Sequence, residues 1–478
     1  MRQRVESTGP PRSSELPVVL VLCVAEFMVL LDISATNLAL ASIRGDLGFS
    51  QADLQWVVTA YRLVFGGLLI FFGRVGDLWG RRRLLLLALA TFSLASLSCG
   101  LSQAPGWLVG SRAVQGMGAA MLVPSALSLL SGSFPEGPSR NRAIGVWGAV
   151  AAVGAAAGLL LGGLLVQVSW RWVFLCNAAI GLATLLTVRR MVGEQRGPVG
   201  GRLDVAGALT VTGGLAALVY GLSQVPVQGA GAPAVLGSFA LAGGLLAAFV
   251  VVEAHAAAPL VPPSLLRVRG VAGADLVMLL GSAVVVAQAF FISLYLRQVL
   301  GYPPLVTSLA LLPSALTVMV VSNLVPRLLP RFGARAVLVV AGGLLAAGMA
   351  LYARLPVDGR YLEVLAGALP AAAGLGSAIV AVTIVATSGV RPEQQGITAG
   401  VLTTAQQVGG AIGVAILASL AAARTGQLAL TQAPLAALNG GFQLAFTVAS
   451  GFALASAVVA ALVIPGRAGA PPAAPPER

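Results

Sequence analysis

Residues 73–111 read GRVGDLWGRRRLLLLALATFSLASLSCGLSQAPGWLVGS, an arginine-rich turn followed by a long uncharged run. From Leu84 to Ser111 the chain carries no charged side chain. An apolar helix needs roughly 20 residues to cross a bilayer core about 30 Å thick, so this run is typical of membrane-spanning helices. Similar uncharged runs recur along the whole chain. We therefore predict an all-α polytopic membrane protein.

The composition of the 478-residue chain supports this prediction, since 58% of its residues are hydrophobic and only 9% are charged. Soluble domains contain roughly 45–50% apolar residues. A β-barrel would show segments of about ten residues with alternating polarity, and no such alternation is present. The first apolar run, near residues 17–40, exceeds a signal-peptide core and carries Glu26 and Asp32, so we expect a retained span.

Hydropathy predicts about fourteen spans. Their count depends on the uncharged residues 205–252, which a Pro- and Gly-containing interruption at 223–233 divides into a hairpin of two spans. The predicted spans are 17–41, 54–73, 84–104, 107–130, 143–167, 172–190, 205–224, 234–252, 272–296, 306–325, 335–353, 363–387, 397–421 and 441–464.

The predicted domain organisation follows from these spans. Two six-helix halves, 17–190 and 272–464, flank a linker at 191–271 that contains the two extra helices. Residues 1–16 form an N-terminal tail, and the Pro-rich residues 465–478 form a flexible C-terminal tail.

A faint internal repeat supports two related halves. Trp79-Gly80-Arg81-Arg82-Arg83-Leu84-Leu85 follows the second span, and Phe332-Gly333-Ala334-Arg335-Ala336-Val337-Leu338 follows the corresponding span of the second half. Many transporters build a midplane site between two similar halves, although channels also contain duplications.

The charges predict the topology. All 29 basic residues are arginine; 21 of them fall on one side of the predicted spans and six on the other. The positive-inside rule then places both termini in the cytoplasm, with the chain in a bacterial inner membrane. The net charge of +13 is explained by these short loops, and we expect no nucleic-acid partner.

The residue inventory disfavours an enzyme. Without lysine the chain can form neither a Walker A loop nor a lysine Schiff base. The single histidine, His255, has no partner at metal-ligand spacing, and Cys23, Cys99 and Cys176 all lie in apolar runs. We expect no disulfide, no metal site, no cofactor and no converging catalytic groups.

The turn at residues 73–83 resembles the signature of the major facilitator superfamily, Gly-x-x-x-Asp-x-x-Gly-Arg-Arg. The resemblance implies that this loop latches two halves in the outward-facing state, through Gly73, Asp77, Gly80, Arg81 and Arg82. The residues alone also fit an ordinary positive-inside loop in which Asp77 caps a helix.

Two further motifs resemble the fourteen-span drug:proton antiporters. They are Leu31-Asp32-Ile-Ser-Ala-Thr-Asn37-Leu-Ala-Leu40 and Trp170-Arg171-Trp172-Val-Phe174-Leu175-Cys-Asn177. The segment Arg112-Ala-Val-Gln115-Gly116 also resembles that family's Arg-x-x-Gln-Gly pattern, which is linked there to proton coupling. The resemblance covers residues 17–464 and implies a monomeric exporter driven by the proton gradient.

Asp32 and Arg112 are the proton-coupling candidates. An ionised side chain at bilayer depth costs about 2.5–3.5 kcal/mol on insertion scales, so each should face a wet cavity or an opposite charge. The proton affinity of a carboxyl group rises on desolvation and falls beside an arginine, which provides a coupling device. We hypothesise that Asp32 alternates between proton and substrate while Arg112 tunes its affinity. A purely structural ion pair is the alternative.

The substrate-binding candidates are the remaining polar groups within the spans. Arg62 is either a structural arginine or a partner of Asp32 or of an anionic substrate. Helical geometry places Glu26 on a different face from Asp32. Gln406 and Gln407 contact substrate or join helices. The complete set is Glu26, Asn37, Arg62, Gln115, Gln406 and Gln407.

Span 143–167 carries a run of glycines, Gly154, Gly158, Gly162 and Gly163, which predicts a smooth face for close helix packing. The antiporter branch normally has Gly-Pro-x-x-Gly-Gly here, a feature associated with exchange. Leu159 stands where that pattern has proline. This departure from the pattern weakens the expectation of proton antiport more than it weakens the expected fold.

Together these features predict a secondary transporter that exports amphipathic drugs, antibiotics or related metabolites in exchange for protons. A facilitator or importer of a small polar metabolite is the nearest alternative. A transport-dead membrane sensor is a third, but it would be expected to carry a folded signalling module, and none is evident.

Overall fold

The computed structural model describes residues 16–133, 138–191, 203–256, 259–261, 268–387 and 395–464. These residues are almost entirely helical and include no β-strand, which confirms the predicted fold class. The tail 1–15, the tail 465–478 and parts of the linker lie outside the described residues.

The helices follow one another with short connections. They are α1 (Leu16–Leu47), η1 (Asp53–Gln55), α2 (Trp56–Trp79), α3 (Arg81–Gly100), α4 (Pro105–Gly132), α5 (Pro138–Val168), α6 (Arg171–Met191), α7 (Val205–Gln228), α8 (Pro233–His255), α10 (Arg269–Leu294), η2 (Tyr295–Val299), α11 (Pro304–Tyr352), α12 (Tyr361–Thr387), α13 (Gln395–Leu428) and α14 (Pro434–Val463).

Within the described residues, 12 helices are long and apolar enough to cross a membrane. One of them is α11, whose 49 residues contain two predicted spans. In addition, α5 covers the predicted span 143–167. Every predicted span therefore falls on a helix. Several helices extend beyond the prediction, because helical hydrogen bonding continues past the uncharged core, as α1 does at Arg44.

The break within α11 occurs at Gly333, which has a φ of 77°. Gly80, which separates α2 from α3, has a φ of 112°. Positive φ values are readily adopted only by glycine, so the same residue type reverses the chain at both places. These are the two glycines of the repeat found in the sequence.

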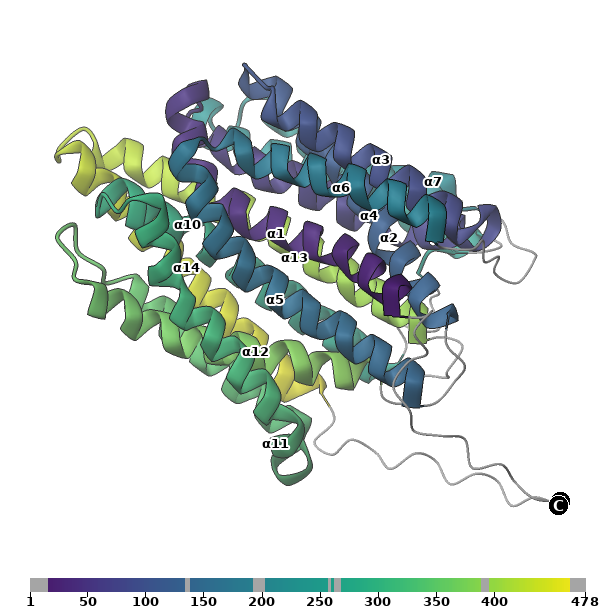
Figure 1. Ribbon diagram of the computed structural model, residues 1–478. Helices are drawn as coiled ribbons and strands as arrows, with labels where there is room; N and C mark the ends of the chain where they lie inside the picture. The colour runs from purple at the N-terminus through teal and green to yellow at the C-terminus, as the bar shows by residue number, and fades with distance from the viewer. Residues whose placement is uncertain are drawn as a thin grey trace, which may run out of the picture.

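The helices form two groups (Figure 1). α1 to α6 pack mainly against one another, as do α10 to α14, and we call these groups the N-terminal bundle and the C-terminal bundle. They meet where α2 packs on α13, α5 on α11 and α1 on α10. The start of α1 and the end of α14 lie at the same end of the molecule.

The two extra helices pair with each other beside the place where the bundles meet. α7 packs against both α2 and α13, whereas α8 packs mainly on α7. Only 11% of the most apolar stretch of α8 is buried within the protein. An apolar helix with so little protein cover is suited to a lipid environment.

The glycines of α5 lie against neighbouring helices. A Cβ atom at Gly158 would approach the Cα of Leu31 to 3.0 Å, and one at Gly162 would approach the Cα of Ala35 to 2.8 Å. Both contacts are with the backbone of α1. Gly154 also faces α1, whereas Gly163 faces Ser308 of α11 across the two bundles. Because these glycines have no side chain, α5 can lie close to α1 and α11.

We expect Gly162→Ala to destabilise the protein in detergent, because its new methyl group would push against the backbone of α1. Overpacking of this kind costs about 1–3 kcal/mol. The measurement is the midpoint temperature of thermal unfolding. Gly451→Ala is the matched control, since a Cβ atom there meets nothing within 4 Å. Equal midpoints for the two variants would contradict the packing argument.

Candidate functional site

A buried ion pair joins α1 to α4. Nη1 of Arg112 lies 2.5 Å from Oδ2 of Asp32. The exposed fraction is 0% for Asp32 and 1% for Arg112, so neither charge reaches solvent in this structure. The two residues that the sequence singled out for proton coupling are therefore direct partners. Their role in coupling stays a prediction.

Arg112 is held in place by neighbours on α2. Its Nε donates a hydrogen bond of 2.8 Å to the backbone oxygen of Val57. The guanidinium lies 4.4 Å from the centre of the Tyr61 ring, a cation–π arrangement. Gly116 makes this close approach possible, because a Cβ atom there would collide with the backbone oxygen of Tyr61.

Gln115 connects the two charges. Its amide nitrogen donates to Oδ1 of Asp32 at 2.8 Å and to Oγ of Ser96 at 2.9 Å. Its amide oxygen accepts from Nη1 of Arg112 at 2.6 Å. Asn177 of α6 adds a longer bond of 3.3 Å to Oδ1 of Asp32. Gln115 therefore belongs to the charge network.

The network joins polar side chains of α1, α3, α4 and α6, and Arg112 also donates to the backbone of α2. Both oxygens of Asp32 accept hydrogen bonds, and its negative charge is balanced by one arginine. Protonation of Asp32 would remove that balance and leave Arg112 as a buried, unpaired cation. Because such a charge is unfavourable at low dielectric, loss of the Asp32 charge would weaken the contact between α1 and α4.

A second buried arginine lies between the bundles. Nη1 of Arg62 on α2 donates a 2.6 Å hydrogen bond to the amide oxygen of Gln407 on α13. The exposed fractions are 8% and 5%. The alternative that Arg62 pairs with Asp32 is not seen, because Asp32 is bound to Arg112.

The other substrate-binding candidates are dispersed. Oε2 of Glu26 is buried without a hydrogen-bond partner among the described residues, and Glu26 is not a partner of Asp32. The amide nitrogen of Asn37 bonds to the backbone of Ile33 within α1. The backbone oxygen of Gln406 accepts from Ser282, which ties α13 to α10.

The arginines of the predicted latch bond to the ends of neighbouring helices. Arg81 donates to the backbone oxygen of Ser128 on α4, and Arg82 donates to that of Arg189 on α6. Cations stabilise the carbonyl ends of helices in this way. Both contacts lie within the N-terminal bundle. The side chain of Asp77 lies outside the described residues, and the latch role stays a prediction.

Further polar contacts join the bundles at the opposite end from the termini. Arg297 of η2 donates to the backbone of Leu38 and to Ser42, both on α1. Arg44 donates to Gln298 at 3.3 Å. Sequence reasoning did not identify these contacts, because each donor and its acceptor are more than 250 residues apart.

Sequence reasoning also missed Asn177 and Ser96 as network members. Asn177 stood in a motif that resembled the antiporters and could have been nominated from it. Ser96 carries no such signal, since one serine in an apolar helix usually bonds to its own backbone, as Ser96 also does to Phe92.

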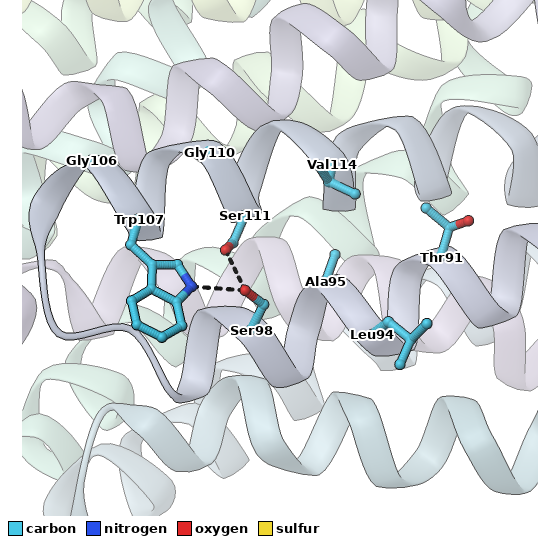
Figure 2. Close-up of a pocket in the computed structure, with 9 residues that line it drawn as sticks. All are labelled: Thr91, Leu94, Ala95, Ser98, Gly106, Trp107, Gly110, Ser111 and Val114. Carbon is cyan, nitrogen blue, oxygen red and sulfur yellow. Dashed lines mark hydrogen bonds between the residues drawn. The ribbon is translucent and has the colours of Figure 1, made fainter.

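An open groove of about 540 Å³ lies on the outer face of α3 and α4 (Figure 2). Ser98 accepts from the indole nitrogen of Trp107 at 2.8 Å and bonds to Ser111 at 2.7 Å. Three polar side chains of the groove, Ser98, Trp107 and Ser111, thus bond to one another, and none of the described residues that line it is titratable. Leu94, Trp107 and Val114 are all exposed on it. We assign this groove no role in transport.

Comparison with known proteins places these features in a family. The model of the Major Facilitator Superfamily matches residues 22–414. The cephamycin export protein CmcT of Amycolatopsis lactamdurans is 43% identical over 87% of this chain and 87% of its own length. The puromycin resistance protein pur8 of Streptomyces alboniger is 40% identical over 94% of this chain and 91% of its own.

Solved structures share the fold. A bacterial homologue of the human lysosomal transporter Spinster, in an inward-facing and unoccupied conformation, superposes with a TM-score of 0.68. The identity is 17%, and the match covers 95% of this chain and 98% of the other. The family match, the two relatives and the shared fold together show that this chain belongs to the major facilitator superfamily of membrane transporters.

Proposed function

We propose that the protein exports amphipathic drugs, antibiotics or related metabolites across a bacterial inner membrane in exchange for protons. The observation that carries this proposal is the buried Asp32–Arg112 ion pair with its supporting amides. An intramembrane charge pair is costly to maintain, and such pairs often serve proton relays in transporters.

The coupling proceeds through the proton state of Asp32. When Asp32 is ionised, Arg112 and Gln115 hold α1 against α4. A proton on Asp32 weakens this contact and favours a conformation in which the helices move apart. This proton is taken up from the outer side, and its release to the cytoplasm restores the ion pair. Each elementary charge that crosses 100 mV supplies about 2.3 kcal/mol, enough to support an outward substrate gradient.

Alternating access requires the bundles to separate at one end and then at the other. The contacts of Arg44 and Arg297 support a closed state at the end opposite the termini. Those contacts break when that end opens. The arginine-rich turns place the termini in the cytoplasm, so this closed end faces outward.

The relatives support the substrate class. Besides the cephamycin and puromycin proteins, a tetracenomycin C resistance and export protein of Streptomyces glaucescens is 34% identical over 87% of this chain. All three names refer to antibiotics. Export of an antibiotic or a similar amphipathic metabolite is the corresponding proposal for this chain.

A facilitator is the second candidate. It is favoured by Leu159, which stands in α5 where the antiporters resembled here have proline. A facilitator would equilibrate its substrate without regard to a pH gradient, which separates the two proposals in one vesicle assay.

We expect Asp32→Asn to abolish proton-driven dye efflux, because asparagine cannot exchange a proton. The measurement is the uptake of Hoechst 33342 into everted membrane vesicles under an imposed pH gradient. Asp46→Asn is the matched control, since Asp46 lies on the same helix and pairs with Arg171 at an exposed position. Undiminished gradient-driven transport by Asp32→Asn would refute the coupling role.

Arg112→Lys is expected to reduce gradient-driven efflux about tenfold. Lysine keeps the charge but cannot bond to Asp32, Gln115 and the backbone of Val57 with the geometry of a guanidinium. Loss of one charge-assisted hydrogen bond, worth about 1.5–3 kcal/mol, accounts for this factor. Arg171→Lys, at the exposed ion pair, should retain efflux. Equal efflux rates for Arg112→Lys and Arg171→Lys would show that transport does not need the guanidinium geometry of Arg112.

A further inference from the structure

Arg62 is a buried cation without an anionic partner. It lies on α2, which packs against α13 of the other bundle, and its exposed fraction is 8%. Its partner, Gln407, is neutral. Among the described residues Arg62 forms no ion pair, and the carboxylate of Asp32 is bound to Arg112. A guanidinium in this position has unused capacity to bind an anion.

The helix face around Arg62 carries further unused polar groups. Gln55 and Thr59 precede Arg62 by seven and three residues, so all three share one face of the helix formed by η1 and α2. Gln55 and Thr59 each have an exposed fraction of 0%. Both amide atoms of Gln55 and the hydroxyl of Thr59 lack hydrogen-bond partners in the described part of the chain.

The facing helix repeats this pattern. On α13 the hydroxyl of Thr404 is also buried without a partner among the described residues, one turn before Gln407. Gly66 lets α13 approach closely, since a Cβ atom there would lie 2.9 Å from Cβ of Gln407. Buried polar groups are normally hydrogen-bonded, so unpaired ones along the two helices that hold a buried cation are available to a polar ligand.

A purely structural role explains these groups less well. If Arg62 served only to join α2 to α13, a carboxylate at position 407 would serve as well as Gln407 and would also balance the charge. In that case the amide of Gln55 and the hydroxyl of Thr59 would have no reason to lack hydrogen-bond partners. A neutral glutamine instead orients the guanidinium and leaves its charge available. The contact also lies between the bundles, so it opens when they separate.

We infer that Arg62, oriented by Gln407, binds a carboxylate of the exported compound between α2 and α13, with Gln55, Thr59 and Thr404 as hydrogen-bonding partners for its other polar groups. This inference rests on the proposed export function and names amphipathic carboxylates as one class of its substrates. Proton coupling at Asp32 and substrate binding at Arg62 are then separate sites on neighbouring helices.

The test compares two fluorescent probes, dansyl-phenylalanine and its methyl ester, which carry a carboxylate and a neutral ester at the same position. Their binding to the purified full-length protein in detergent is followed by dansyl fluorescence. Native protein should bind the acid at least tenfold more tightly than the ester, which is the factor expected for one hydrogen bond to a charged group. Arg62→Met should remove this preference by weakening binding of the acid alone.

A second variant keeps the test valid if Arg62→Met does not fold. Gln407→Glu keeps the size of the side chain and supplies Arg62 with an internal carboxylate. It should fold normally and compete with the probe, so that the preference for the acid is lost. Arg44→Gln is the control, because Arg44 also bonds to a glutamine across the bundles, at a partly exposed position. It should retain the preference.

Equal binding of acid and ester by native protein, or equal weakening of both by Arg62→Met, would overturn the inference. Binding in detergent needs no proton gradient, so the outcome is independent of coupling. The result expected for Arg62→Met is loss of the acid preference while the ester still binds as it does to native protein. If native protein prefers the acid but its transport ignores the pH gradient, the proposed function fails while the binding site stands.

Discussion

The ion pair between Asp32 and Arg112 is the interaction on which the arrangement of the N-terminal bundle depends. It places opposite charges on α1 and α4 in an interior with no solvent exposure. Neither charge is tolerable there without the other, and their remaining hydrogen-bonding capacity has to be met by protein groups. Gln115, Ser96 and Asn177 meet it, so α3 and α6 are drawn into the same network.

The same constraint distinguishes the two buried arginines. Arg112 has a carboxylate, a backbone oxygen and an aromatic ring around it, and its charge is fully compensated. Arg62 has one neutral amide. The first arrangement suits a proton switch within one bundle, and the second suits a ligand site between bundles. A transporter that keeps the two apart can change its substrate site without altering its coupling.

Close packing by glycine supports both sites. Gly116 brings Tyr61 onto Arg112, Gly66 brings α13 onto α2, and the glycines of α5 bring it onto α1. A single methyl group at most of these positions would meet a neighbouring backbone or side chain at less than contact distance. In an interior without strong apolar driving forces between helices, such small residues allow the backbone approach that polar contacts need.

The sequence by itself determined the all-α membrane fold, the approximate helix positions and the family, because uncharged runs of membrane-spanning length and the motif at residues 73–83 are local features. It also nominated Asp32, Arg112 and Gln115. Only the tertiary structure decided that these three bond to one another, that Arg62 pairs with Gln407 and that Asp32 is closed to solvent. Arg112 and Gln115 are neighbours on one helix, but the partners on different helices are 80 to 345 residues apart in the chain. Their meeting depends on which helix faces pack together, and that depends on the whole bundle.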